Sequence, residues 1–232
     1  MIDLYALTSP NVQKIFIALE ELQLPYKPIY VDIWAGEHFV PEFGKINLNR
    51  KIPVIVDHDG PGGKPYTVFE SGAILMYLSD KTGKLLPADK AARFEALQWL
   101  MLQMASIGPM SGQVVHFSKF APAGNDYSLS RFKTELNRLW DVYEERLSQS
   151  PYVGGKDYSI ADIAVYPWLR NYDFLGMTFD GRPKLKAYVD KITERPAVQK
   201  MLAILPTIKS SRDTATPAQK DRVFGRGEFA RV

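Results

Sequence analysis

The sequence of 232 residues contains no cysteine. This absence excludes disulfide bonds, thiolate metal ligands and a cysteine nucleophile, so a thiol that reacts here must belong to a ligand. The 3 histidines lie far apart and lack metal-ligand spacing. We therefore expect neither a metal site nor thiol chemistry on the protein's own side chains.

Long apolar runs and basic blocks are scarce as well. The apolar runs are much shorter than the roughly 20 residues that a helix needs to cross a bilayer, and the N-terminus lacks the basic region and apolar core of a signal peptide. The net charge is +3, and no block of Lys and Arg interleaves with aromatic residues in the body of the chain. We therefore expect a cytoplasmic protein with no membrane and no nucleic-acid partner.

The first third of the chain alternates between strand and helix patterns. Pro10 suits the first position of a helix that ends before Pro25, and Gly83 suits the end of another. Strands are expected at 2–7, 26–33, 54–56 and 67–69, a helix at 71–81, and a short helix or irregular segment at 34–48. The order β-α-β-α-β-β-α, with a parallel βαβ unit before a hairpin and a covering helix, is the thioredoxin arrangement.

Beyond the first third the apolar residues follow helical spacing alone. Helices are expected at 89–118 with a break at Gly108-Pro109, at 128–148, from a Ser159–Asp162 capping box onward, at 183–194 and at 196–205. The fold class is therefore α/β plus all-α, with an N-terminal thioredoxin-like domain at 1–83, a linker at 84–89, a helical bundle at 90–205 and a C-terminal tail at 206–232.

Two short stretches in the first domain suggest a binding site. Ile52-Pro53 stands before a strand, where a proline, which cannot donate to a ladder, is tolerated and a cis bond is common enough to expect. Glu70-Ser71-Gly72 opens a helix, whose first N–H groups are free to hold an anion. An exposed backbone edge beside a helix N-terminus suits a short, acidic, peptide-like ligand.

These stretches also carry a family resemblance. Lys51-Ile52-Pro53, Glu70-Ser71-Gly72, the Ser159–Asp162 box and Glu194-Arg195-Pro196-Ala197-Val198, in this order and spacing, resemble the glutathione transferases over both domains, to about residue 205. A narrower resemblance is to the bacterial nu class, whose members are similar in being glutathione-dependent disulfide reductases. It rests on Pro10-Asn11 with Lys14, Pro41-Glu42-Phe43, Gly108-Pro109-Met110, Gly112-Gln113 and His116-Phe117.

The resemblance implies a set of glutathione-binding residues. Ser71 is expected to hold the γ-glutamyl carboxylate, and Glu70 the ammonium. Ile52, before Pro53, is expected to pair with the backbone of the ligand's cysteine as an added strand does. Lys51 and His38 are expected to meet the glycyl carboxylate, although the family often has Gln in place of His38. Glu70 and Ser71 could also serve only as a helix cap, and Lys51 as a solvated surface residue.

The thiolate is the nucleophile, and a free thiol has a pKa near ~8.5. Hydrogen bonds and a helix N-terminus lower this pKa, and Thr8, Ser9 and Asn11 lie where the first helix is expected to begin. We expect these three to be catalytic, with either Thr8 or Ser9 facing the sulfur. The family motif is Thr-Pro-Asn, whereas this chain has Ser9-Pro10-Asn11. Tyr5 is an alternative donor, but its place inside a strand favours core packing.

The second domain is expected to face the other reactant. Arg131 resembles the nu-class arginine that contacts a second glutathione or glutathione disulfide, and a guanidinium suits carboxylates. Gln113, His116 and Phe117 could line the same cleft, and Arg138 is the substitute if Arg131 is only a surface residue.

The resemblance implies a homodimeric, glutathione-dependent disulfide-bond reductase that uses glutathione as co-substrate and acts on a small disulfide or electrophilic substrate. Two alternatives stay open. One is a glutathione S-transferase that conjugates electrophiles, and the other is a non-enzymatic regulatory protein of the same fold. The sequence predicts the ligand better than it predicts the reaction.

Overall fold

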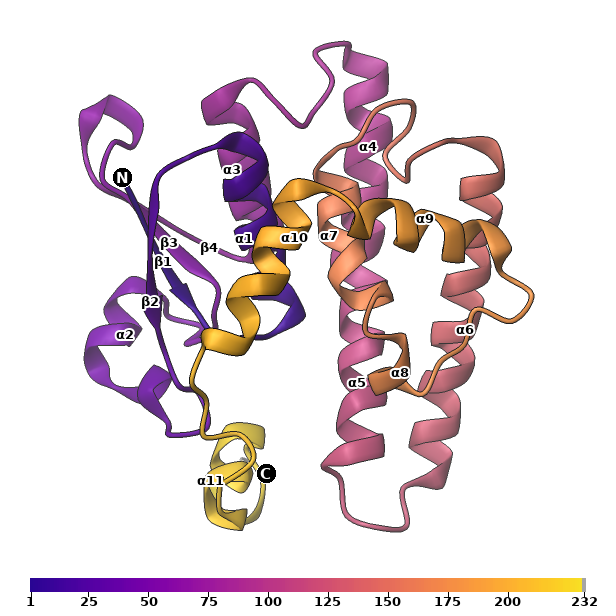
Figure 1. Ribbon diagram of the computed structural model, residues 1–232. Helices are drawn as coiled ribbons and strands as arrows, with labels where there is room; N and C mark the ends of the chain where they lie inside the picture. Colours follow the sequence, from indigo (N-terminus) through magenta and orange to yellow (C-terminus); the bar gives the residue numbers. More distant parts are fainter. Residues whose placement is uncertain (231–232) are drawn as a thin grey trace. The chain divides into compact units, whose positions relative to one another are not determined.

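The computed structural model describes residues 1–230. The chain forms two compact units, one made of Met1–Ile74 with Lys200–Val232 and the other of Leu75–Gln199. The boundaries fall inside two helices, α3 (Ser71–Thr82) and α10 (Pro196–Ile204). The first unit is therefore assembled from the two ends of the sequence, as the colours of Figure 1 show.

The first unit is built on a four-stranded sheet of order β2-β1-β3-β4. Its strands are β1 (Ile2–Ala6), β2 (Tyr26–Tyr30), β3 (Val54–Asp57) and β4 (Tyr66–Phe69). β1 and β2 are parallel, and β3 is antiparallel to both of its neighbours. This is the mixed sheet of a thioredoxin-like domain, so the predicted fold of this part is confirmed.

The alternation of β1 divides the core into two layers. Ile2, Leu4 and Ala6 of β1 are buried. Most residues of α1 (Pro10–Leu22) are buried as well. Tyr5 points to the other face, where it packs edge-on against Phe43 of α2 (Pro41–Ile46), with ring centroids 6.0 Å apart. The structure therefore agrees with core packing for Tyr5.

Between β2 and β3 the chain leaves the sheet earlier than expected. β2 ends at Tyr30 rather than at residue 33, because the side chain of Asp32 accepts a hydrogen bond from the backbone N–H of Trp34 and turns the chain. A 3₁₀ turn (Glu37–Phe39) and α2 follow. Of the two alternatives expected for this region, a short helix or an irregular segment, the structure has the short helix.

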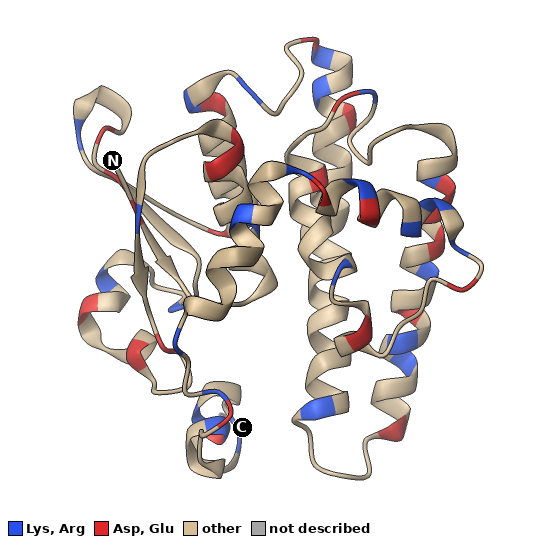
Figure 2. Cartoon of the chain, viewed as in Figure 1, with Lys and Arg blue, Asp and Glu red and all other residues tan. Residues whose placement is uncertain are grey.

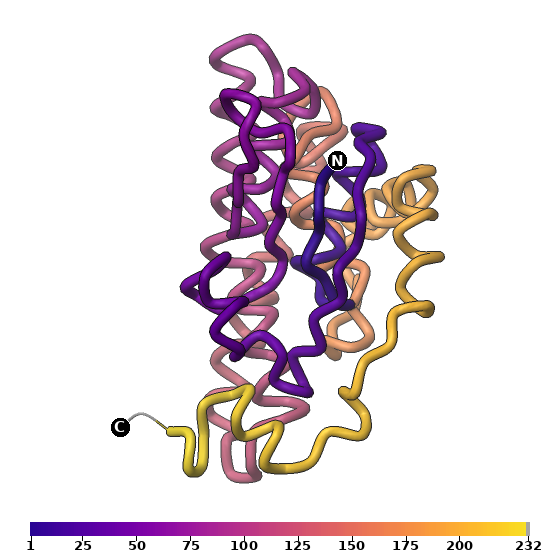
Figure 3. Tube along the Cα trace, turned by 90° about the vertical axis from the view of Figure 1, so that its left-hand side faces the viewer, coloured from indigo at the N-terminus to yellow at the C-terminus, as the bar shows by residue number. Residues whose placement is uncertain are grey.

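The segment after α10 belongs to the first unit. It contains the 3₁₀ turn Leu205–Thr207, helix α11 (Pro217–Phe224) and a last 3₁₀ turn (Gly227–Phe229). Figure 3 shows it leaving α10 as an extended chain and then folding into α11. The sequence showed no periodicity here; the helix nevertheless forms, with a capping box of Thr216 and Gln219 and a left-handed Gly225 at its end.

The second unit is helical. Its helices are α4 (Lys90–Leu102), α5 (Gly108–Lys119), α6 (Asp126–Gln149), α7 (Ile160–Leu169), α8 (Tyr172–Leu175) and α9 (Pro183–Thr193). A π-helical turn (Gln103–Ile107) joins α4 to α5 just before Gly108, where the sequence predicts a break. The core holds the fully buried rings of Trp140, Tyr143 and Tyr166.

The predicted capping box of α7 is present. The buried carboxylate of Asp162 accepts hydrogen bonds from the N–H groups of Val153 and Ser159, at 2.8 and 2.9 Å, and from the hydroxyls of Ser159 and Tyr188. Burial raises the pKa of Asp162, while these donors act in the opposite direction. The carboxylate thus joins α7, α9 and the preceding loop.

Acidic and basic side chains are interspersed along the elements of both units (Figure 2). Several form ion pairs within one helix, such as Lys186 with Asp190 at 2.6 Å. None of the helices within residues 1–230 is both long enough and apolar enough to span a membrane.

Candidate functional site

Three of the predicted site segments meet at one end of the sheet. In the strand register Tyr5 pairs with Val54, and Val54 pairs with Phe69. The chain runs from β1 into Thr8–Asn11, from Ile52-Pro53 into β3, and from β4 into Glu70-Ser71. The strand pairing alone therefore brings the predicted thiol-activating residues beside both halves of the predicted ligand-holding stretch.

The turn that leads to Ile52 is held by an asparagine. The buried side chain of Asn47 donates to the carbonyl of Lys51 at 2.7 Å and accepts from the N–H of Asn49 at 2.9 Å. The Ile52-Pro53 bond is cis, as predicted. Ile52 is half-buried and Lys51 is exposed, so the edge of this turn is open to a ligand.

Arg50 ties the same turn to the neighbouring segment. Its guanidinium donates to the carbonyls of Phe39 and Val40, at 2.7 and 2.8 Å. It passes so close to Gly44 that a Cβ there would lie 2.6 Å from the guanidinium. Arg50 thus positions the turn, and its charge stays close to the site.

The start of α3, where the sequence predicts an anion-binding site, lies over a buried lysine. Ser71 is buried, and the ammonium of Lys14 donates to its hydroxyl at 3.3 Å. Lys14 is itself fully buried, so burial lowers its pKa well below the usual value, an effect that the Glu70 carboxylate opposes. Glu70 is exposed and has a left-handed backbone, φ 69°, which few residues other than glycine adopt. Such local strain is frequent at ligand sites.

The first turn of α1 presents three polar residues. Ser9 is the N-cap, and its carbonyl accepts from the N–H groups of Val12 and Gln13, but its hydroxyl makes no capping hydrogen bond. Gln13 donates to the carbonyl of Thr8 at 2.8 Å, which fixes the backbone there. Thr8, Ser9 and Asn11 are all partly exposed. Since the Ser9 hydroxyl is not used for capping, it is available to a ligand, and so is the hydroxyl of Thr8.

His38 is buried beside a group of cations. Its ring lies on Phe39 with centroids 3.9 Å apart, and its Nδ1 has no hydrogen-bond partner among the described residues. Burial first, and then the charges of Lys51, Arg222 and Arg50, lower the pKa of His38 to about 4. The imidazole is therefore neutral at pH 7 and sits within the positive potential of this corner.

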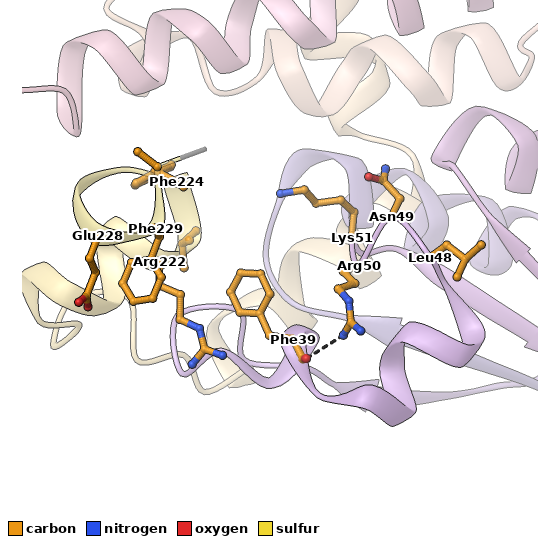
Figure 4. A pocket seen from close by; sticks show the side chains of 12 residues that line it. Phe39, Leu48, Asn49, Arg50, Lys51, Arg222, Phe224, Glu228 and Phe229 are labelled. Atoms are coloured by element: carbon orange, nitrogen blue, oxygen red, sulfur yellow. Dashed lines mark hydrogen bonds between the residues drawn. The ribbon is translucent and has the colours of Figure 1, made fainter. Parts of the chain in front are cut away.

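A cleft of about 930 Å³ opens between the Leu48–Lys51 turn and the C-terminal segment. Phe39 forms its floor, and residues 222–225 and 228–230 form the facing wall. In Figure 4 the ammonium of Lys51 reaches across the opening toward this wall, while Arg222 descends from α11 beside the ring of Phe39. The cleft belongs entirely to the first unit.

Arg131 lies in the other unit, in α6. Its side chain is 59% exposed, and the distance from its guanidinium to the Glu135 carboxylate is 3.9 Å. Arg138 makes the closer contact with Glu135, at 2.6 Å. Arg131 is therefore the more available of the two guanidinium groups.

Several residues that shape the site were not predicted as such from the sequence. Asn47 and Arg50 hold the turn from behind, Lys14 holds Ser71, and Arg222 comes from a segment without periodicity. Asparagines at 47 and 49, shortly before Ile52, are typical of a turn, and this signal could have indicated the role of Asn47. A lysine on the buried face of α1 is the signal for Lys14. Within the described chain no group of three or more His, Asp and Glu residues could hold a metal ion.

Comparison with known proteins bears on both units. The family model for the glutathione S-transferase N-terminal domain matches residues 8–81, and that for the glutathione S-transferase C-terminal domain matches residues 107–196. The disulfide-bond oxidoreductase YfcG of Escherichia coli is 44% identical over 203 residues, which are 87% of this chain and 94% of the relative.

Two solved structures have similar folds. A glutathione transferase family member from Pseudomonas fluorescens, with two glutathione molecules bound, has a TM-score of 0.82 and 43% identity, over 87% of this chain and 92% of its own. A glutathione transferase from Pseudomonas putida, with one glutathione disulfide per subunit, has a TM-score of 0.83 and 42% identity, over 88% of this chain and 91% of its own.

Proposed function

Since this chain belongs to the glutathione transferase family, we propose that it is a glutathione-dependent disulfide-bond reductase. The observation that carries the proposal is what two related proteins bind. At 43% and 42% identity to this chain, one holds two glutathione molecules and the other holds one glutathione disulfide per subunit. Such a site accommodates both sulfurs of a disulfide exchange. The oxidoreductase relative is consistent with this chemistry, and a chain without cysteine must take the thiol from glutathione.

The first unit binds the reacting glutathione. Ser71 and the N–H groups at the start of α3 receive the γ-glutamyl carboxylate, with the Lys14 ammonium behind the hydroxyl. Glu70 pairs with the ammonium of the ligand. The N–H and C=O of Ile52, before the cis Pro53, pair with the cysteinyl backbone. Lys51 and His38 lie toward the glycyl end.

The same binding mode directs the sulfur to the start of α1. Asn11 and one of the hydroxyls of Thr8 and Ser9 donate hydrogen bonds to it, and the helix N-terminus adds partial positive charge. Both effects stabilise the thiolate over the thiol and so lower the pKa of the bound glutathione.

The reaction is two successive exchanges at sulfur. The glutathione thiolate attacks one sulfur of the substrate disulfide, forms a mixed disulfide and expels the other sulfur as a thiolate, which takes up a proton. A second glutathione, after loss of its proton, attacks the glutathione sulfur of the mixed disulfide and releases glutathione disulfide and the second substrate thiol. Two glutathiones are oxidised for each disulfide reduced.

Arg131 is assigned to a carboxylate of the second glutathione. Its exposure and its long distance to Glu135 support this role, since the guanidinium can exchange that partner for a ligand. The chain acts as a homodimer, which light scattering would test, because a monomeric mass in solution would contradict it. The reaction belongs in the cytoplasm, where glutathione keeps thiols reduced.

A paired activity assay tests the function. With glutathione, hydroxyethyl disulfide and a coupled glutathione reductase, we expect steady turnover that depends on both substrates. An aryl halide, the usual conjugation substrate, should react much more slowly. Fast conjugation of the aryl halide with no turnover of the disulfide would overturn the proposal in favour of a transferase. Glutathione binding without either activity would favour a binding protein.

A further inference from the structure

The C-terminal segment is fastened to the first unit at several points. Asp32 accepts two hydrogen bonds of 2.7 Å from the N–H and hydroxyl of Ser211. The ring of Phe224 meets Trp34 edge-on with centroids 5.9 Å apart. These contacts hold α11 beside the 32–39 stretch. The C-terminal family model ends at residue 196, so the whole segment lies outside both matched domains.

This attachment brings one more cation to the cleft. The guanidinium of Arg222 lies 4.8 Å from the ring centroid of Phe39. This cation–π contact holds the guanidinium beside the ring and leaves its N–H groups available for a carboxylate. Arg222 is exposed, and across residues 1–230 it has no carboxylate within ion-pair distance.

The cleft is positively charged. Its lining contains Arg50, Lys51 and Arg222 but a single acid, Glu228. Arg50 is committed to two backbone carbonyls, so Lys51 and Arg222 are the two cations free to bind a ligand. The rings of Phe39, Phe224 and Phe229 line the same space, so apolar side chains lie beside these two charges.

The position of the cleft identifies the part of the ligand that enters it. A peptide laid along Ile52 with its γ-glutamyl end at Ser71 has its other end at Lys51, next to the cleft. On the basis of the proposed function, we propose that Arg222 is a specificity-determining residue which binds the glycyl carboxylate of glutathione together with Lys51. The C-terminal segment then selects thiol peptides that end in a free carboxylate one residue after the cysteine.

The test uses the full chain and three ligands in calorimetric titrations: glutathione, its glycyl ethyl ester, and γ-glutamylcysteine, which lacks the glycine. Arg222→Gln should weaken glutathione about tenfold, the usual size of one charge-assisted contact, and change the other two less than about twofold. Arg222→Lys keeps the charge but loses the planar fork of the guanidinium, so its affinity for glutathione should lie between those of the wild type and Arg222→Gln.

Lys220→Gln is the matched control. It removes the same charge from the same helix, but its side chain does not line the cleft. It should leave all three affinities unchanged. An Arg222→Gln protein that binds glutathione as tightly as the wild type would overturn the proposal, and so would equal weakening of all three ligands, since that indicates a merely structural role.

The result is distinguishable from a failure of the proposed reaction. If the wild type binds glutathione and Arg222→Gln discriminates among the ligands while hydroxyethyl disulfide is not reduced, the reductase is wrong and the role of Arg222 stands. If hydroxyethyl disulfide is reduced and Arg222→Gln does not discriminate among the ligands, the reductase function stands and the role of Arg222 is wrong. A wild type that binds no glutathione contradicts both.

Discussion

At the scale of single residues, much of the candidate site depends on side chains behind the ligand-facing surface. Asn47 and Arg50 satisfy backbone groups of the turn that carries Ile52, and Lys14 orients the hydroxyl of Ser71. A buried lysine is costly to fold around, because burial opposes its charge. The Glu70 carboxylate partly offsets this cost, because its charge favours the ammonium form of Lys14.

The roles of the residues that we propose to activate the thiol can be separated by mutation. We expect Asn11→Ala to lower kcat for disulfide exchange between about 10- and 100-fold, because one hydrogen bond to a charged sulfur is removed. Thr8→Val or Ser9→Ala should lower kcat to a similar extent, whichever of the two removes the hydroxyl that faces the sulfur. Thiolate absorbance of bound glutathione against pH measures the cause directly, since the pKa of the thiol should rise in the affected variants.

The glutathione dissociation constant serves as the control in these variants, and it should change little because the backbone contacts at Ile52 remain. A thiol titration that is identical in the wild type and in all three variants would contradict the assignment of Thr8, Ser9 and Asn11 to the sulfur.

His38 predicts a pH dependence of stability. Its pKa in the folded chain is about 4, against 6.5 for an ordinary histidine. The folded state therefore favours the neutral ring: its contribution to stability is complete above pH 6.5 and is lost as the pH falls toward 4. The loss amounts to roughly 3 kcal/mol. The cations that face the ring, Lys51, Arg222 and Arg50, remain charged through this window.

His38→Gln tests this expectation, since an amide does not titrate. Urea unfolding at a series of pH values should show the free energy of unfolding falling less steeply for His38→Gln than for the wild type between pH 6.5 and 4. The difference between the two proteins isolates His38 from the carboxylates that titrate in the same range. Parallel curves would show that His38 is not buried in its neutral form.

The residue types that we propose to contact the ligand could be identified from the sequence, whereas the side chains that support them could not. Ile52, Pro53, Glu70 and Ser71 belong to a local pattern with a physical reason at each position. Lys14 contacts Ser71 across 57 positions of sequence, and no local pattern predicts which buried face of α1 will meet the start of α3. Long-range contacts of this kind need the fold.

At the scale of elements, the helices with strong apolar spacing were predicted within a few residues. α6 was expected at 128–148 and spans Asp126–Gln149, and α9 was expected at 183–194 and spans Pro183–Thr193. α8 and α11 are 4 and 8 residues long. An element of one or two turns is too short to show a helical period. For α11 the signal in the sequence was the capping box of Thr216 and Gln219.

The capping box of α7 gives a prediction at this scale. Asp162→Asn replaces two of the acceptor lone-pair positions with an amide NH₂ that faces N–H donors, so at least one buried donor loses its partner. We expect the free energy of unfolding to fall by about 3 kcal/mol, measured by urea denaturation. Asp157→Asn, at an exposed position five residues earlier, is the control and should change stability by less than ~0.5 kcal/mol.

The residues of the first unit that we propose to bind glutathione should be unaffected by that change. Equal stability of Asp162→Asn and the wild type would mean that the buried carboxylate is not the acceptor on which α7 and α9 depend. Loss of glutathione binding in a protein that still unfolds cooperatively would point instead to a role of Asp162 beyond folding.

At the scale of the whole molecule, the two compact units do not follow each other along the chain. Residues 200–230 pack with Met1–Ile74, and the helical unit is inserted between them. Periodicity along a sequence predicts elements and their order, but it carries no information about which distant elements share a core. The tail after residue 205 could for this reason be delimited from the sequence but not assigned to a unit.

This insertion sets an order of events during synthesis. The ribosome completes the strands of the sheet first, then the entire helical unit, and only then Ser211, which binds Asp32, and Phe224, which packs on Trp34. A nascent chain that has emerged only to residue 199 lacks one wall of the cleft. The helical unit can therefore fold before the first unit is complete, and the cleft is expected to form only after residues 222–230 have emerged from the ribosome.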